Sequence, residues 1–243
     1  MFLKVEDPQT GKVWEVSKKN KIKDVSADVY ARWVINCVVP KEIVRKVVKL
    51  DFLEPIMVKG KAVLSLCCIF MRHSAPVWMP LHLGPASHNC ALRIACIDKR
   101  DNTQAVWVDH RHTDCFLAPV LEFLGFPEVH TGLKVIEEEN RLELTTKFGA
   151  INCRLTKSEA DGYRLFDNDE EFGEYFCAGI RSYSEHGSKN QIDIIDLHKL
   201  KDNKFKRKPF NGTLSTPYGT WFTESVYLTE NGMYQWVYEG KVS

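Results

Sequence analysis

The sequence has almost no excess of charge of either sign. Its 33 Lys and Arg residues stand against 32 Asp and Glu residues, which leaves a net charge of +1. A basic surface for a nucleic-acid duplex or an anionic membrane is therefore missing, and we expect no nucleic-acid partner and no membrane partner. The chain also has no run of 18 apolar residues and no apolar signal core after Met1, which argues against a membrane-spanning helix and a secretory leader.

None of the eight cysteines belongs to a Cys-x-x-Cys pair, a common signature of zinc and redox sites. Most of them lie in apolar runs, which favours small buried hydrophobic residues over a zinc site or a disulfide framework. The eight are Cys37, Cys67, Cys68, Cys90, Cys96, Cys115, Cys153 and Cys177. Reduced thiols predict a cytoplasmic protein.

Common catalytic motifs are also missing. The chain has no Gly-x-Gly-x-x-Gly, no Gly-x-x-x-x-Gly-Lys, no Gly-x-Ser-x-Gly and no His-Glu-x-x-His. These motifs mark dinucleotide, phosphate, serine-hydrolase and zinc-protease chemistry, so none of these is indicated. We expect no cofactor.

Short runs rich in β-branched and aromatic residues, separated by Gly, Pro, Asn and Asp, predict strands. The best cover residues 62–70, 91–97, 104–108, 142–147 and 151–155. Turn residues at 100–102 and 148–150 predict antiparallel pairing. Helices are predicted after Pro40, over 119–125, and over 169–178 with Asn168 as a cap.

The chain is expected to form one domain over residues 1–243. Residues 1–25 are polar and predict a peripheral arm with a hairpin near Gly11, and residues 26–198 the main sheet. Residues 199–243 predict a basic linker followed by a hairpin that turns at Asn231-Gly232, a strong signal for a two-residue turn. The basic run at 199–208 indicates a solvated linker more than an RNA contact, because Phe205 is the only aromatic residue among its charges and the whole chain is nearly neutral.

Ionisable residues gather at one place among the apolar strands, over residues 109–114. Strand alternation would put Asp109, Arg111 and Thr113 on one face and the other three residues on the opposite face. That second face carries His110, His112 and Asp114. Two imidazoles and a carboxylate are metal-ligand types, but the spacing is short and no fourth ligand is evident, so we predict no metal. A polar loop after residue 109 is the alternative.

Arginines at the ends of apolar strands are candidate donors to a carboxylate or an enolate oxygen. Arg93 and Arg111 fit this role, although structural ion pairs with Asp residues are equally compatible with their positions. Arg72 and His73 follow the longest apolar strand and are candidates for substrate contact at its mouth, with a structural histidine as the alternative. Trp107, on the strand at 104–108, is a third candidate for substrate contact.

The order of features from residue 30 to 155 resembles the acetoacetate decarboxylase-like superfamily. The resemblance rests on the helix with Arg45-Lys46-Val47-Val48, the strands at 62–70 and 91–97, the strand Ala105-Val106-Trp107-Val108, and Leu124-Gly125-Phe126-Pro127-Glu128. It implies an α+β fold made mainly of antiparallel β-strands. The expected architecture is a barrel or cone-like sheet that encloses a ligand cavity, with a few peripheral helices.

The resemblance also implies a chemistry that this sequence lacks. The family's decarboxylases form a Schiff base between a β-keto acid and a lysine whose pKa is lowered. The position that matches this lysine is Glu122, its neighbour is Phe123, and the predicted helix contains no lysine. Between Glu54 and Glu122 there is also no glutamate to match the family's pocket glutamates.

We therefore expect a small-molecule enzyme that acts on a carbonyl or polyketide-like substrate without a Schiff base, as a non-imine lyase, isomerase or cyclase. In it, Arg93 or Arg111 would hold an oxyanion, His110 or His112 would move a proton, and a buried Glu122 would act as acid or base. The alternative is a non-catalytic binding protein for an apolar small ligand, with Glu122 facing solvent. A polar cavity would favour the enzyme and an apolar one the carrier. A homo-oligomer is left open.

Overall fold

A computed structural model describes residues 2–6, 13–17, 22–127, 129–159, 165–177, 181–185, 191–201 and 203–242. The strands are β1 (Phe2–Glu6), β2 (Val13–Ser17), β3 (Asp24–Val39), β4 (Leu53–Pro55), β5 (Met57–Val58), β6 (Lys61–Pro76), β7 (Ser87–Asp98), β8 (Thr103–Thr113), β9 (His130–Thr131), β10 (Lys134–Glu138), β11 (Arg141–Thr145), β12 (Asn152–Lys157), β13 (Arg181–Glu185), β14 (Ile192–Lys201), β15 (Lys206–Arg207), β16 (Phe210–Thr216) and β17 (Gly219–Val242). The helices are α1 (Lys41–Val47), α2 (Ala118–Phe123) and α3 (Asp169–Cys177), with short 3-10 turns η1 (Leu81–Leu83) and η2 (Lys147–Gly149).

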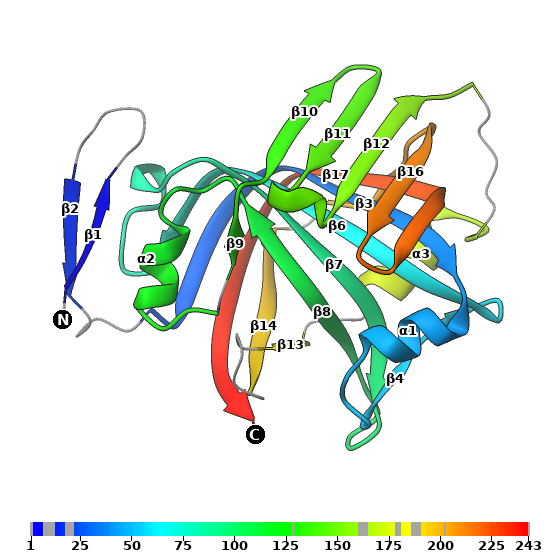
Figure 1. Cartoon of the computed structure of the whole chain (residues 1–243), viewed down its shortest axis with the longest axis horizontal. Helices are drawn as coiled ribbons and strands as arrows, with labels where there is room; N and C mark the ends of the chain where they lie inside the picture. Colours follow the sequence, from blue (N-terminus) through cyan, green and yellow to red (C-terminus); the bar gives the residue numbers. More distant parts are fainter. Residues whose placement is uncertain are drawn as a thin grey trace.

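Seven strands pair in a closed circuit. The order is β3, β6, β7, β8, β13, β14 and β17, and β17 pairs with β3 again to close the ring. Within this circuit, β8 and β13 run parallel and the other neighbours run antiparallel. Figure 1 shows these strands curving around a common interior. The prediction of a mainly antiparallel, cone-like sheet with few helices is confirmed.

A wing of four further strands extends from the ring. β17 is long enough to pair with β14 through its second half and with β16 through its first, and the wing continues through β12 and β11 to β10. The largest apolar core lies between the ring and this wing, with members from β3, β6, β7 and β8 on one side and from β11, β12 and β16 on the other. Each ring strand therefore has one face toward this core and one toward the interior of the ring.

Aromatic residues of α3 pack against the inner face of the ring. Phe172 stacks on Tyr227 of β17 with ring centroids 3.6 Å apart, and Phe176 contacts Phe205 edge to face. The helix begins where the sequence predicts, because the Asn168 side chain accepts a hydrogen bond from the backbone N–H of Glu171 at 2.8 Å. This cluster fills one part of the ring and leaves a cavity in another.

The local predictions agree with the observed elements. The five predicted strands overlap β6, β7, β8, β11 and β12, and the helices predicted after Pro40 and over 119–125 are α1 and α2. β1 and β2 form a separate antiparallel pair, as expected of a peripheral hairpin, while Gly11 lies outside the described residues. Among the described residues, none of the helices has the length and apolar character needed to cross a membrane.

The predicted hairpin at Asn231-Gly232 is wrong. β17 continues through this dipeptide and pairs with β3 on both sides of it, at Glu230 with Ala31 and at Gly232 with Val29. Asn231 does adopt a positive φ of 57°, but the neighbouring strands hold it as a local irregularity within one strand. The two-residue connection lies earlier, at residues 217–218 between β16 and β17.

The basic run at 199–208 is not wholly a linker either. β14 continues to Lys201, and residues 206–207 form β15, which pairs with β17. The reason is that β17 presents backbone partners along most of its length, so polar segments beside it are drawn into the sheet.

Candidate active site

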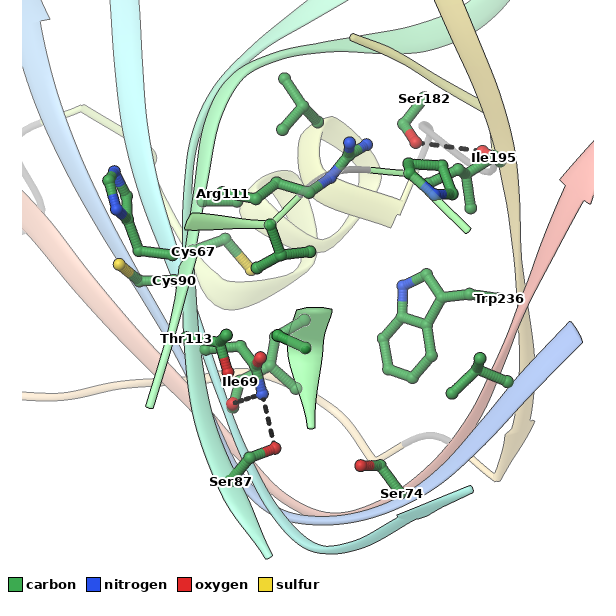
Figure 2. Close-up of a pocket in the computed structure, with 18 of the residues that line it drawn as sticks. Cys67, Ile69, Ser74, Ser87, Cys90, Arg111, Thr113, Ser182, Ile195 and Trp236 are labelled. Atoms are coloured by element: carbon green, nitrogen blue, oxygen red, sulfur yellow. Dashed lines mark hydrogen bonds between the residues drawn. The ribbon is translucent and has the colours of Figure 1, made fainter. Parts of the chain in front are cut away.

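A cavity of about 190 Å³ lies inside the ring. Its walls come from β3, β6, β7, β8, β13, β14 and β17, and α2 contributes Ala118 and Leu121. The volume is below the roughly 300 to 1,000 Å³ of pockets for drug-sized ligands, so the cavity suits a small metabolite. Figure 2 shows Cys67, Arg111 and Trp236 among the side chains around it.

Strand register decides which side chains point inward. Val34, Cys67, Ala91 and Arg111 lie side by side across β3, β6, β7 and β8. Side chains two residues along a strand share a face, so this row also places Arg32 and Arg93 on the inner face. Arg32, Cys67, Arg93 and Arg111 are all lining residues of the cavity.

An irregularity at Asp109 reverses the alternation of β8. Val108 lies opposite Arg93, whereas His110 lies opposite the next residue of β7, Leu92, so Asp109 is the extra residue. A bulge of this kind lets residues on either side of it, here Val108 and Arg111, face the same way. Both of these line the cavity.

The same irregularity turns His110 and His112 to the outer face. His112 lies across from Cys90, and Cys90 lies across from Cys68, which both belong to the core between ring and wing. Figure 2 shows the sulfur of Cys90 on the far side of its strand from the cavity, whereas that of Cys67 points inward. His112 is nevertheless among the residues that line the cavity, so a role for it in proton transfer stays a prediction.

The outer histidines form a group of their own. Burial and the charges of His130 and His110 lower the pKa of His112 to about 4, and its Nε2 has no hydrogen-bond partner. His110 Nδ1 contacts the carboxylate of Asp109, which also accepts a hydrogen bond from Tyr218 Oη at 2.9 Å. This hydrogen bond to Asp109 raises the pKa of His110. The lowered pKa of His112 keeps its own imidazole neutral near pH 7.

Arg32 and Arg93 are cations without a carboxylate partner in the cavity. Arg32 is 3% exposed, and its Nε and Nη1 have no hydrogen-bond partner. Its guanidinium carbon lies 4.7 Å from the ring centroid of Phe176, and that of Arg93 lies 4.3 Å from the same ring. None of the described residues that line the cavity is Asp, Glu or Lys. A small anion would fill this deficit of negative charge.

Burial and neighbouring charges act differently on the three arginines. Burial and the charge of Arg32 lower the pKa of Arg93, whereas for Arg32 itself the contacts with Cys67 and Tyr234 outweigh burial and raise the pKa. Burial lowers the pKa of Arg111 to about 10, although the charge of Asp193 opposes this. Arg111 Nη1 donates a hydrogen bond to Ser184 Oγ at 2.7 Å, which orients the guanidinium. All three stay cationic near pH 7.

Cys67 lies between the first two arginines. The positive charges of Arg32 and Arg93 both act on its sulfur. Burial raises the pKa of this thiol, but the two positive charges outweigh it, so the pKa lies below the ordinary value of 9.0. An inward thiol whose pKa is lowered is therefore part of the site.

Other candidate residues from the sequence lie elsewhere. Glu122 is exposed on α2, because Ala118 and Leu121 form the helix face toward the cavity. Arg72 bonds to Asp28 at 3.0 Å. Glu122 therefore faces solvent, the alternative stated above, and Arg72 belongs to an ion pair outside the cavity.

His73 and Trp107 also have structural surroundings. His73 Nδ1 lies 3.1 Å from the carbonyl oxygen of Gly84, the structural alternative for this histidine. Trp107 is fully buried in the core between ring and wing, on the face of β8 opposite to the cavity. Neither side chain is among those that line the cavity.

The His110, His112 and Asp114 set does not converge. Asp114 turns to His88, whose Nδ1 lies 2.6 Å from Asp114 Oδ2. Across the described part of the chain, no group of three or more His, Cys, Asp or Glu side chains has a geometry that would hold a metal ion.

Arg32 and Cys67 are the site residues that sequence reasoning missed. A signal was present for Arg32, a lone charged residue in the run Ala31-Arg32-Trp33-Val34, where alternation gives it a face of its own. Cys67 had no such signal, because it is one of many apolar-run cysteines.

The ring and the wing have the acetoacetate decarboxylase-like fold, as the sequence resemblance predicted. Acetoacetate decarboxylase from Legionella pneumophila subsp. pneumophila matches with a TM-score of 0.58 at 13% identity, over 97% of this chain and 94% of that chain. An acetoacetate decarboxylase-like enzyme from Sphingomonas wittichii RW1 matches with a TM-score of 0.55 at 11% identity, over 92% and 93%. The enduracididine biosynthesis enzyme MppR matches with a TM-score of 0.52 at 9% identity, over 98% and 92%.

These identities establish a shared fold and nothing more. No family model and no curated protein matches the sequence. The function has to be argued from the site.

Proposed function

We propose that this protein is an enzyme that acts on a small carbonyl compound bearing a carboxylate, and that it works without a Schiff base. The observation that carries the proposal is the set of three inward arginines, of which Arg32 keeps two buried nitrogens without a partner. Guanidinium groups bind carboxylates through paired, charge-assisted hydrogen bonds. A carrier for apolar ligands would not need three buried cations.

Two of the arginines suit the carboxylate and the third suits the reacting oxygen. Arg32 and Arg93 lie close enough for their charges to interact, and both are stacked on Phe176. Arg111 enters from β8 with its orientation set by Ser184. A fixed cation near a carbonyl oxygen stabilises the negative charge that develops on it in enolisation, retro-aldol or decarboxylation steps. This covers the lyase, isomerase and cyclase chemistries.

A Schiff base has no support from the described lysines. Lys59 forms an ion pair with Asp167 at 2.5 Å, and Lys61 and Lys134 are exposed. The fold neighbour MppR has been solved in complex with the condensation product of pyruvate and imidazole 4-carboxaldehyde, so this architecture accommodates a keto-acid derivative. In this chain the charge of the substrate would be met by arginine.

The setting of the proposal follows the sequence expectations. One domain over residues 1–243 is supported by the ring, which takes strands from β3 to β17. A cytoplasmic location is supported by the seven described free thiols, all buried: Cys37, Cys67, Cys68, Cys90, Cys96, Cys115 and Cys153.

The test uses levulinate, a small keto acid, and its uncharged methyl ester. Isothermal titration should show binding of levulinate and at least about tenfold weaker binding of the ester, the scale of one charge-assisted hydrogen bond. Arg32→Met should remove the preference, whereas Arg72→Met, which changes an exposed arginine, should keep it. Equal binding of acid and ester would refute the arginine site.

Hydrogen–deuterium exchange on the ligand distinguishes catalysis from binding alone. In D₂O an enzyme of this kind should exchange the protons next to the carbonyl of levulinate, which NMR follows, whereas a carrier would bind without exchange. Borohydride with acetoacetate should leave no adduct, since reduction traps imines. A lysine adduct found by peptide mapping would restore the Schiff-base mechanism.

A further inference from the structure

Few of the described residues that line the cavity could form a carbon bond or exchange a proton near pH 7, namely the thiols of Cys67, Cys90 and Cys115 and the imidazole of His112. The histidines of β8 lie on the outer face, and the described lining residues include neither lysine nor carboxylate. Among its titratable side chains, the three arginines keep their protons near neutral pH. Cys67 is therefore the group to consider.

The surroundings of Cys67 are positively charged and suit an anion. Figure 2 shows the sulfur directed into the cavity, which Arg32 and Arg93 also line, and the charges of both arginines act on it. Arg32 is only 3% exposed, and its Nε and Nη1 have no hydrogen-bond partner. A carboxylate bound in the cavity would supply the charge partner that this guanidinium lacks.

Comparison with the remaining thiols shows that this environment is specific. Burial raises the pKa of each of the six other cysteines whose side chains the structure describes, namely Cys37, Cys68, Cys90, Cys96, Cys115 and Cys153. Cys67 is the described thiol whose pKa is lowered. Cys115 also lines the cavity but lacks the arginine contacts, so it serves as an internal control.

We propose that Cys67 is the nucleophile of this cavity, and that it adds to the β-carbon of a small α,β-unsaturated carbonyl compound bearing a carboxylate. This deepens the proposed function and rests on it. A thiolate is a strong nucleophile even when it is weakly basic, and conjugated alkenes are the electrophiles that soft sulfur attacks most readily. The arginines would position the carboxylate so that the adjacent carbon faces the sulfur.

The step balances without any further reactant. A sulfur lone pair forms a C–S bond to the β-carbon, the π pair of the C=C bond shifts toward the carbonyl, and the oxygen becomes an enolate. Arg111 stabilises this enolate. The enolate then takes a proton at the α-carbon from water, or returns its electron pair and expels the thiolate. Because the C–C bond is single in the adduct, expulsion after rotation isomerises the double bond, which is an isomerase reaction.

The probe is trans-4-oxo-2-pentenoate, the unsaturated analogue of levulinate, with its methyl ester as the uncharged match. Intact mass should show one equivalent of the acid per chain, and peptide mapping should place it on Cys67 and not on Cys115. Each labelling rate is divided by the rate of the same compound with free N-acetylcysteine. On this scale the acid should react at least about tenfold faster than the ester. Arg93→Met should remove this preference, and Cys67→Ala should remove the adduct.

The pH dependence of labelling distinguishes a lowered thiol pKa from mere accessibility of the sulfur. Labelling of Cys67 should reach its plateau at a lower pH than labelling of Cys115 in the same molecule, because its thiolate forms earlier. Peptide mapping of the unsubstituted protein gives both rates, so the result does not depend on whether a variant folds.

The outcomes separate this inference from the proposed function. If levulinate binds but the unsaturated acid leaves Cys67 unmodified, Cys67 is not the nucleophile and the arginine site still stands. If Cys115 reacts first, or if acid and ester label Cys67 equally, the anion-guided thiol is also refuted. If levulinate does not bind and no acid labels the protein, both proposals are wrong.

Discussion

His112 should make the stability of this protein sensitive to mild acid. The pKa of this buried imidazole is lowered from 6.5 to about 4 by burial and by the charges of His130 and His110. Folding therefore favours the neutral ring. As the pH falls below 6.5 the unfolded chain takes up a proton that the folded chain refuses until about pH 4, so stability is present above pH 6.5 and is lost toward pH 4.

The shift sets the size of the effect. A change of 2.5 units, from 6.5 to 4, corresponds to about 3.4 kcal/mol when complete, of which about 2 kcal/mol falls between pH 7 and pH 5. Because the ring borders the cavity and is partly screened there, we expect about 1 to 2 kcal/mol over that interval. For a chain of this length this is a fall in Tm of roughly 2 to 8 °C.

The assay compares the protein with His112→Phe, an apolar ring that suits the core around Cys90. Urea unfolding at pH 7 and pH 5 should show that the variant loses about 1 to 2 kcal/mol less than the unsubstituted protein on acidification. A packing penalty would lower the free energy of unfolding equally at both pH values. His110, whose pKa is raised, is present in both proteins, so its own titration cancels in the comparison. His82→Gln, at an exposed position, should leave the pH response unchanged. An identical acid response in His112→Phe would refute the reasoning.

Three further outcomes are expected in urea unfolding. Gly232→Ala should cost about 1 to 3 kcal/mol, because a Cβ there would lie 2.4 Å from Cε2 of Tyr234; an unchanged midpoint would contradict the packing. Asn231→Val should cost about 1 to 2 kcal/mol through its φ of 57°, and Asn231→Gly much less; equal costs would exclude backbone strain. Asp98→Asn should cost about 1 to 2 kcal/mol at pH 7, since hydrogen bonds from Arg100 lower the pKa of this carboxyl to about 2. That cost should fade as the pH falls from about 4 to about 2, and a cost independent of pH would refute the ion pair.

Local sequence signals predicted most elements of this fold. Pro40, Asn168 and Gly125 mark helix ends through backbone preferences that act within a few residues. Alternating apolar runs mark strands for the same reason. These effects need no partner strand, so they are visible in the sequence, and so is the feature order that resembles the acetoacetate decarboxylase-like superfamily.

The Asn231-Gly232 dipeptide shows where local signals fail. In isolation it favours a two-residue turn. In the protein it lies within β17, which pairs with β3 on both sides of the dipeptide and with β14 from Met233 onward, and these pairings keep the chain extended. Tertiary pairing therefore outweighed the local preference, which amounts to about 1 kcal/mol.

The site was determined by tertiary structure at two points. The irregularity at Asp109 decided that Arg111 and not His112 enters the cavity, and a single inserted residue of this kind leaves no reliable trace in composition or periodicity. The pairing of β6 with β3 on one side and with β7 on the other then brought Arg32 and Arg93 onto the two sides of Cys67. The sequence by itself determined that these residues sit on strands. Only the register between distant strands decided which faces meet, because side-chain direction reverses with every residue.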